Sequence, residues 1–214
     1  MKILALEFSS SQRSVAVADD RRVSSEVIES GGRGTNALAM VDGALREANL
    51  EREQIECLAV GIGPGSYTGI RVAISVAQGW QLARGVKLLG ISAIECLAAQ
   101  AQADGLRGDV TTVIDAQRSE FYIARYKISP EGRREITPLQ LTGLSDVLAM
   151  GKAGELLIGP EVTRSIPTGK IMFPRATTLA ELASNRSDFV SGETLEPIYL
   201  RETSFVKAPP PRFF

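Results

Sequence analysis

The sequence contains no histidine among its 214 residues. This absence excludes catalytic triads built on histidine, as well as zinc and iron sites that depend on imidazole ligands. General acid–base chemistry near pH 7 would have to use a carboxylate, lysine, tyrosine or cysteine whose pKa is shifted. The commonest routes to hydrolytic and metal-dependent catalysis are therefore closed.

The sequence also has few cysteines, a net charge close to zero and no long apolar run. Cys57 and Cys96 fall inside predicted elements, so we expect buried thiols in a cytoplasmic protein and no disulfide framework. The 24 Lys and Arg residues nearly balance the 25 Asp and Glu residues, which leaves no basic field to hold nucleic acid unaided. No apolar run is long enough to span a bilayer, and Glu7 comes too early for a signal peptide.

Apolar segments and turn residues predict an α/β protein built from two similar halves. The first half is expected to hold strands over 3–8, 14–18, 23–28, 57–61 and 86–91, with helices over 35–49, 66–84 and 92–102. The second half is expected to hold strands over 110–115, 121–128, 136–141 and 156–159, with helices over 144–150 and 179–189. Parallel strands with crossover helices imply a layered fold, with lobes over 1–106 and 107–214 and an extended Pro-rich tail.

The most unusual segment is 61–71, Gly-Ile-Gly-Pro-Gly-Ser-Tyr-Thr-Gly-Ile-Arg, which joins a strand to a helix. Ser66 or Thr68 can cap that helix. The four glycines suit either an anion cradle or a tight turn that packs the helix close to its sheet. The segment matches neither a Walker A loop nor the Gly-x-Gly-x-x-Gly spacing. Arg71 could bind phosphate or form a surface pair, so both interpretations stay open.

A carboxylate ends the first strand of each half. Two-lobed actin-like kinases and ATPases place an acidic residue there and follow it with a glycine-rich phosphate turn. Here Glu7 precedes Phe-Ser-Ser-Ser and Asp115 precedes Ala-Gln-Arg, without glycine in either turn. A backbone without glycine forms an anion-binding nest with difficulty. Glu7, Ser9 and Ser10 therefore form at most a degenerate phosphate turn, and we favour local capping by both carboxylates.

The helix after the glycine-rich turn carries no charged side chain from Val72 to Ala83. A helix that is apolar nearly all round must be covered nearly all round. We expect its outer face to be covered by the 35–49 helix and by another chain. The alternative is a core formed entirely within the chain.

Six segments stand out in order along nearly the whole chain: Ile3-Leu-Ala-Leu-Glu-Phe-Ser-Ser, Ser14-Val-Ala-Val, Gly63-Pro-Gly-Ser-Tyr-Thr-Gly-Ile-Arg71, Gly90-Ile-Ser-Ala-Ile-Glu-Cys-Leu-Ala-Ala99, Ile114-Asp-Ala-Gln-Arg-Ser-Glu-Phe-Tyr122 and Pro197-Ile-Tyr-Leu-Arg201. Together they resemble the TsaB (YeaZ) family. This bacterial family, also labelled M22 glycoprotease-like, is related to the transferase TsaD, which installs threonylcarbamoyl on adenosine 37 of ANN-decoding tRNAs. The resemblance implies an actin-like (ribonuclease H-like, ASKHA) fold with two similar lobes.

The resemblance also implies that the chemistry has been lost. The metal-holding His-x-x-x-His pair of TsaD corresponds to Ser92 and Cys96 here, and a hydroxyl with a lone thiol cannot hold the same metal. Glu7-Phe-Ser departs from the usual Asp-Thr-Ser, and Arg33 takes the place of a histidine that usually precedes the first helix. We therefore expect no catalytic residue, no metal and no cofactor.

The same resemblance implies a scaffold role. In the family, the first-lobe helices build a bundle with TsaD, or with a second TsaB when TsaD is absent. That use would place six residues at the contact: Leu38, Val41, Leu45, Ile70, Ile74 and Ala77. The chain would bind and activate TsaD, with TsaE as third partner, tRNA reached only through the complex and no membrane partner. The alternatives are a free-standing nucleotide-dependent enzyme of actin-like fold, or an M22-type peptidase, which lacks a set of residues to activate a nucleophile.

Overall fold

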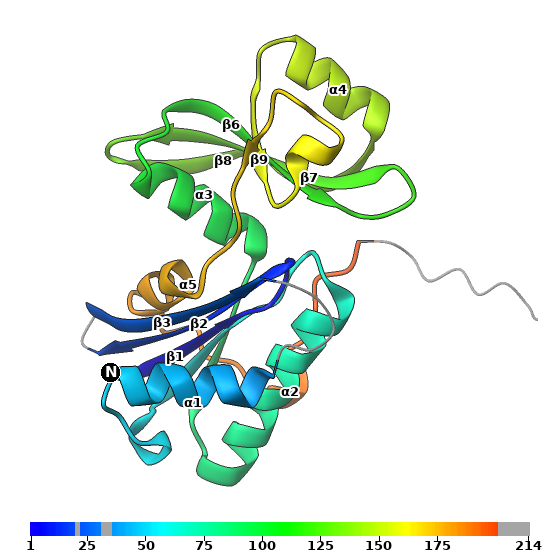
Figure 1. Cartoon of the computed structure of the whole chain (residues 1–214). Helices are drawn as coiled ribbons and strands as arrows, with labels where there is room; N and C mark the ends of the chain where they lie inside the picture. The colour runs from blue at the N-terminus through cyan, green and yellow to red at the C-terminus, as the bar shows by residue number, and fades with distance from the viewer. Residues whose placement is uncertain (20–21, 31–35, 201–214) are drawn as a thin grey trace, which may run out of the picture.

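The computed structural model describes residues 1–19, 22–30 and 36–200, which form two lobes stacked one above the other (Figure 1). Arg33 and the tail after Leu200, both considered above, lie outside these residues. Each lobe is built on one five-stranded mixed sheet. Within the described residues, no helix is long and apolar enough to cross a bilayer.

The first sheet has the order β3-β2-β1-β4-β5. Its strands are β1 (Ile3–Glu7), β2 (Gln12–Asp19), β3 (Arg22–Ser30), β4 (Cys57–Gly61) and β5 (Lys87–Ile91). β1 pairs antiparallel with β2 and parallel with β4, so it lies at the centre. All five strands were expected from the sequence, within two residues at most ends.

The second sheet has the order β10-β9-β6-β7-β8. Its strands are β6 (Gly108–Asp115), β7 (Glu120–Ser129), β8 (Gly132–Gly143), β9 (Leu156–Gly159) and β10 (Lys170–Ile171). When the strands of each sheet are numbered along the chain, starting from β1 and from β6, both sheets have the order third, second, first, fourth, fifth. In both, the first two pairings in that order are antiparallel and the last two are parallel. The repeat that is absent at residue level is therefore present in the topology, and the fold is the two-lobed actin-like α/β fold.

Helices cover both faces of each sheet (Figure 1). α1 (Ala37–Glu47) and α2 (Tyr67–Arg84) share a core with Leu4 and Leu6 on one face of the first sheet. α5 (Ala176–Ala183) packs on Ile3 and Ala5 of the other face. In the second lobe, α3 (Ala93–Ala103) and α4 (Leu144–Lys152) take opposite faces. Between β9 and β10 stands only a short 3-10 turn, Val162–Arg164, so α2 has no helical counterpart there.

The last helix of each lobe packs on the sheet of the other lobe. α3 follows β5 of the first sheet but packs on β6, β7 and β8, whereas α5 follows the second sheet but packs on β1 and β2. α3 and α5 touch each other between the lobes. The expected boundary at residue 106/107 falls between α3 and β6, and it stays a prediction.

The chain after α5 differs from the expected helix over 179–189. α5 ends at Ala183, and residues 190–199, which we call the strap, run beside the first sheet. Val190 bridges to Leu88 of the edge strand β5, and the Ile198 N–H donates to the Ile62 carbonyl at 2.9 Å. The strap thus closes one edge of the first sheet and ends next to the start of α2.

Candidate functional site

Glu7 ends β1 and is fully buried. Its Oε1 accepts a hydrogen bond from the Ser9 N–H at 2.7 Å. Burial raises the pKa of Glu7 to about 7, and the hydrogen bonds from Ser9 offset only part of that effect. A carboxyl group in this position is enclosed by the chain and does not face the cleft described below, where a nucleotide or its metal would have to bind.

Two glycines of the 61–71 segment lie directly against this first turn. A Cβ at Gly61 would stand 2.1 Å from Glu7 Oε2, and one at Gly65 would stand 2.1 Å from the Ser9 carbonyl oxygen. Gly65 also has φ of 146°, which an L side chain rarely adopts. The Ser66 N–H donates to the same Ser9 oxygen at 2.7 Å. On the side where these glycines lack a Cβ, the turn packs directly against the chain and leaves no space for an anion.

The first turn of α2 continues this close packing. A Cβ at Gly69 would stand 2.0 Å from the Phe8 carbonyl oxygen. Ser66, and not Thr68, caps the helix, since its Oγ accepts from the Gly69 N–H at 3.3 Å. Carbonyl oxygens therefore face the glycine-rich turn, and they would repel a phosphate. Of the two interpretations left open by the sequence, the structure supports the tight turn.

Asp115 occupies the matching position in the second lobe, but it is exposed. Its Oδ1 accepts from the Gln117 N–H at 2.6 Å, which is the local capping expected from the sequence. Gln117, Arg118 and Ser119 have φ of 66°, 58° and 61°, three consecutive non-glycine residues in the left-handed region. The turn leaves the Arg118 side chain exposed.

A cleft of about 830 Å³ lies between the two turns. It is lined by both lobes and the strap: Ser9, Ser10, Ser11, Gly65, Ser66, Tyr67, Arg71, Ile114, Asp115, Ala116, Gln117, Arg118, Tyr122, Pro160, Glu161, Ile198 and Tyr199. Ser9 and Ser10 are only 3% and 7% exposed, and Ser10 Oγ is committed to the Gln12 carbonyl at 2.7 Å. Within the described residues, the buried floor of the cleft thus offers phosphate little beyond the unpartnered Ser9 Oγ. Its two arginines, Arg71 and Arg118, are exposed and mark the mouth of the cleft.

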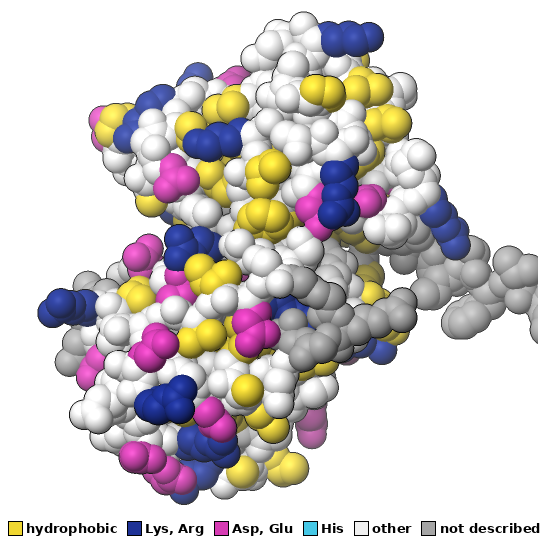
Figure 2. All heavy atoms as spheres, in the orientation of Figure 1, with side chains coloured by type: hydrophobic (Ala, Val, Ile, Leu, Met, Phe, Trp, Pro, Cys, Tyr) yellow, Lys and Arg dark blue, Asp and Glu magenta, His cyan; other side chains and the backbone are white. Residues whose placement is uncertain are grey.

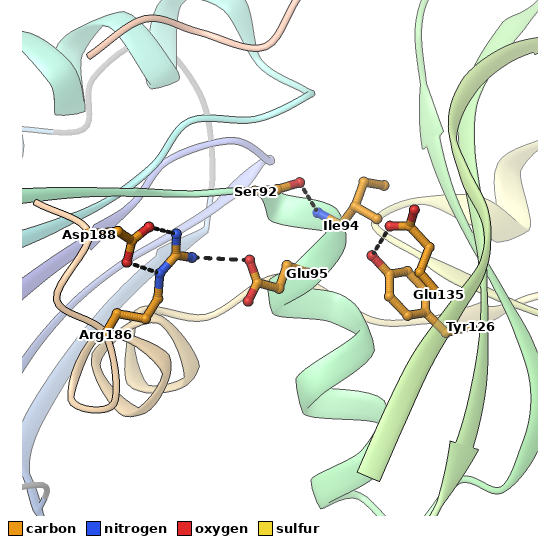
Figure 3. A network of polar contacts seen from close by, with 7 residues as sticks. All are labelled: Ser92, Ile94, Glu95, Tyr126, Glu135, Arg186 and Asp188. Atoms are coloured by element: carbon orange, nitrogen blue, oxygen red, sulfur yellow. Dashed lines mark hydrogen bonds and ion pairs between the residues drawn. The ribbon is translucent and has the colours of Figure 1, made fainter. Parts of the chain in front are cut away.

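Ser92 and Cys96, the positions of the lost metal pair, have structural roles. Ser92 caps α3 by accepting from the Ile94 N–H at 3.1 Å (Figure 3). Cys96 is fully buried, its Sγ lies 3.5 Å from the Arg175 carbonyl oxygen, and burial raises the pKa of its thiol well above the ordinary value. Among the described residues, no group of three or more His, Cys, Asp or Glu side chains could hold a metal ion.

A second hollow of about 600 Å³ lies beside Ser92, between α3 and β8. Its acidic side chains already have partners (Figure 3). Arg186 Nη1 contacts Glu95 Oε2 at 3.3 Å, and the Tyr126 hydroxyl donates to Glu135 Oε2 at 3.1 Å. These contacts tie α3 to the segment after α5 and tie β7 to β8, so the acidic groups of the hollow are engaged in structural contacts.

The six residues expected at a partner contact do not lie on one surface. Leu38 is 56% exposed, but the other five are buried in the core between the first sheet, α1 and α2: Val41, Leu45, Ile70, Ile74 and Ala77. None of these five is more than 5% exposed. Their side chains point toward the sheet, so they cannot touch a partner while the fold is intact, and this placement corrects the choice of residues.

The exposed side of α2 carries a different set, which we call the α2 face: Tyr67, Thr68, Arg71, Ser75, Gln78, Gly79, Leu82 and Ala83. Arg71 is its one charged residue, and Leu82 is 91% exposed. Figure 2 shows hydrophobic side chains, in yellow, at the surface of the lower lobe where α2 runs. Sequence reasoning missed this set because it selected the most apolar residues. The helical period would have placed Ser75 and Gly79 opposite Ile74 and Ala77.

The strap covers one flank of α2. Gln78 Nε2 donates to the Gly192 carbonyl at 2.8 Å, and the Gly192 N–H donates to Gln81 Oε1 at 2.6 Å. Leu195 of the strap is buried in the same core as α2. Part of the cover that the helix needs is therefore supplied within the chain, while the α2 face stays exposed among the described residues.

Comparisons with known proteins agree with this arrangement. A family model described as TsaD, tRNA N6-adenosine threonylcarbamoyltransferase, matches residues 34–201. A TsaB from Haemophilus influenzae, named tRNA threonylcarbamoyladenosine biosynthesis protein TsaB, is 30% identical over 80% of this chain and 81% of its own length. The chain is a TsaB-type member of the TsaD family. The Escherichia coli TsaB is 28% identical over 94% of this chain and 95% of its own length.

A solved TsaB-type structure, "YeaZ from Pseudomonas aeruginosa", superposes with a TM-score of 0.80 at 26% identity. The match covers 93% of this chain and 99% of that one. The two-lobed arrangement is therefore shared at full length with the TsaB (YeaZ) proteins.

The buried Glu7 of this TsaB-type chain predicts a pH-dependent stability. Its folded-state pKa of about 7 lies above the ordinary glutamate value of 4.5, so between these pH values the folded state keeps a proton that the unfolded state loses. Protonated Glu7 therefore stabilises the folded state fully below pH 4.5. This stabilisation, on the order of 3 kcal/mol, is lost as the pH rises to about 7. Urea unfolding of wild type and Glu7→Gln at pH 5 and 8 measures it. The free energy of unfolding of Glu7→Gln should fall much less than that of wild type between pH 5 and pH 8. An equal fall in both proteins would contradict the assignment to Glu7.

Proposed function

We propose that the chain is a non-catalytic subunit in tRNA threonylcarbamoyladenosine biosynthesis. It binds TsaD and supports the transfer of threonylcarbamoyl to adenosine 37 of ANN-decoding tRNA, which places it in the cytoplasm. The α2 face is the observation that carries this proposal. It is a nearly uncharged surface on an 18-residue helix that has no counterpart in the second lobe.

The sequence spacing of the α2 face suits a neighbouring helix. Four residues of the α2 face and the half-buried Val72 follow one another at alternating intervals of four and three: Thr68, Val72, Ser75, Gly79 and Leu82. This spacing keeps one stripe of a helix turned toward a packed helix, and small residues at Ser75 and Gly79 allow close approach. Burial of a side chain like that of Leu82, which is 91% exposed, contributes roughly 1.5–3 kcal/mol.

The state of the former chemical sites supports a scaffold over an enzyme. Glu7 is enclosed, the glycine-rich turn is filled by carbonyl oxygens, and Ser92 and Cys96 are committed to a cap and a core. Neither a nucleotide-dependent enzyme nor a peptidase gains support from these residues. The subunit would act by holding the active lobe of TsaD in an ordered conformation.

The remaining partners follow from the same surface. A second copy of the chain would use the α2 face when TsaD is absent, and TsaD would displace it. TsaE and tRNA would be reached through the complex with TsaD. Leu38 of α1, which is exposed on the same side of the sheet, stays a candidate at the edge of the contact.

Sedimentation of the chain with purified TsaD tests the proposal. At about 10 µM of each protein, a contact of roughly 1,000 Å² or more should give a stable complex that replaces the self-associated chain. If the two proteins sediment independently at that concentration, the chain is not a TsaD-binding subunit.

A further inference from the structure

Three side chains form a stack where the cleft meets the α2 face. The guanidinium carbon of Arg71 lies 4.1 Å from the centre of the Tyr67 ring, and Arg71 Nε donates to the Tyr199 hydroxyl at 3.3 Å. The two tyrosine rings are 5.8 Å apart between centroids. Tyr67 and Tyr199 are 56% and 44% exposed, so the stack stands at the surface. We call Tyr67, Arg71 and Tyr199 the mouth cluster.

The mouth cluster holds a cation, Arg71, that has no carboxylate partner in the described part of the chain. Among the described residues, neither Arg71 nor the neighbouring Arg118 has an ion pair within 4.0 Å. The two acidic residues that line the cleft are already engaged, because Asp115 accepts from the Gln117 N–H and Glu161 pairs with Arg164 at 2.8 Å. Among the described residues, the two arginines that line the cleft therefore lack a carboxylate partner.

The geometry of Arg71 suits an anion that offers two oxygens side by side, such as a carboxylate. Its Nε donates to Tyr199, and its guanidinium carbon lies over the Tyr67 ring. Within the described residues the two terminal nitrogens have no hydrogen-bond partner, so they can bind the two oxygens of one carboxylate side by side. A phosphate would use the same fork, but it would gain few further donors from the cleft floor, where carbonyl oxygens face the glycine-rich turn and Ser10 Oγ is already committed.

We propose that the mouth cluster anchors the TsaD partner by binding an acidic side chain of that protein. This inference rests on the proposed function, because Tyr67 and Arg71 belong to the α2 face. Tyrosine and arginine dominate the energetics of protein interfaces, and a rigid, stacked arginine loses little freedom on binding. The strap contributes Tyr199, so the partner contact would extend beyond the two first-lobe helices. Tyr199 acts as a positioning residue for Arg71.

Affinity for TsaD at two salt concentrations tests the anchor. Arg71→Gln removes the charge at an exposed position, so the fold should persist, as circular dichroism can verify. We expect Arg71→Gln to weaken binding at least tenfold at about 50 mM salt and to remove most of the salt dependence seen for wild type. Arg84→Gln, at the other end of α2, is the matched control and should change affinity less than twofold. Tyr199→Phe should weaken binding to TsaD by less than Arg71→Gln and by more than Arg84→Gln.

The outcomes separate this inference from the proposed function. If wild type does not bind TsaD, the proposed function fails. If wild type binds and Arg71→Gln binds equally well with the same salt dependence, only the anchor is overturned. Calorimetry of the chain alone with inorganic phosphate provides the third arm. If wild type releases heat with phosphate, Arg71→Gln does not, and Arg71→Gln still binds TsaD with wild-type affinity, the cluster binds a small anion and the proposal is overturned.

Discussion

Replacing Gly69 with alanine is expected to destroy most of the stability of the chain. The added Cβ would stand 2.0 Å from the Phe8 carbonyl oxygen, a backbone atom that cannot move without shifting β1 or α2. We expect a loss of more than about 4 kcal/mol, against a total of roughly 5–15 kcal/mol for a protein of ordinary stability. Thermal and urea unfolding measure it.

Gly79→Ala is the matched control on the same helix. Outside the helix's own backbone, no described residue has an atom within 4 Å of a Cβ at Gly79. Alanine is also the better helix former, so this variant should gain up to about 1 kcal/mol. If Gly69→Ala proves as stable as Gly79→Ala, the glycine-rich turn is not packed against the first strand as described.

Two neighbouring residues of α2 are expected to respond in opposite ways to the same substitution. Ile74 is 5% exposed in the core, so Ile74→Glu places a carboxylate among apolar side chains and should unfold the chain. Ser75 is exposed on the α2 face, so Ser75→Glu should fold normally but bind TsaD about 100-fold more weakly, because a charge is buried without a partner. Unfolding curves and sedimentation of each variant with TsaD provide the comparison.

Ser75→Ala controls for the loss of the hydroxyl and should bind TsaD with nearly wild-type affinity. Wild-type affinity in Ser75→Glu would show that TsaD binds elsewhere. A stable, well-folded Ile74→Glu would show instead that the core assignment of that side of α2 is incorrect.

The strands and most helices could be predicted because burial leaves a periodic record in the sequence. β1 and β4 are buried on both faces and read as continuous apolar runs, whereas β3 alternates because it is exposed on one face. The end of α5 was placed too late, since Phe189 and Val190 of the next segment extend its apolar pattern. β10 has only two residues, Lys170 and Ile171, and leaves no pattern.

The candidate site was harder to predict, because it depends on which side of α2 meets the sheet. Apolar residues such as Ile70 and Ile74 drew attention as a contact, and apolarity is the reason that they are buried in the core. Small and polar residues such as Ser75 and Gly79 form the exposed side and carry little signal on their own. The mouth cluster joins residues 128 positions apart, Arg71 and Tyr199, and no local pattern encodes that contact.

Reconstituted threonylcarbamoyl transfer to tRNA tests the scaffold role most directly. With TsaD, TsaE, ATP and a synthase that supplies the adenylate, adding the chain should raise product formation strongly, and Ser75→Glu should not. The chain without TsaD should form no product at any concentration. Product formed by the chain alone, or a rate that does not change when the chain is left out, would contradict a non-catalytic subunit that activates TsaD.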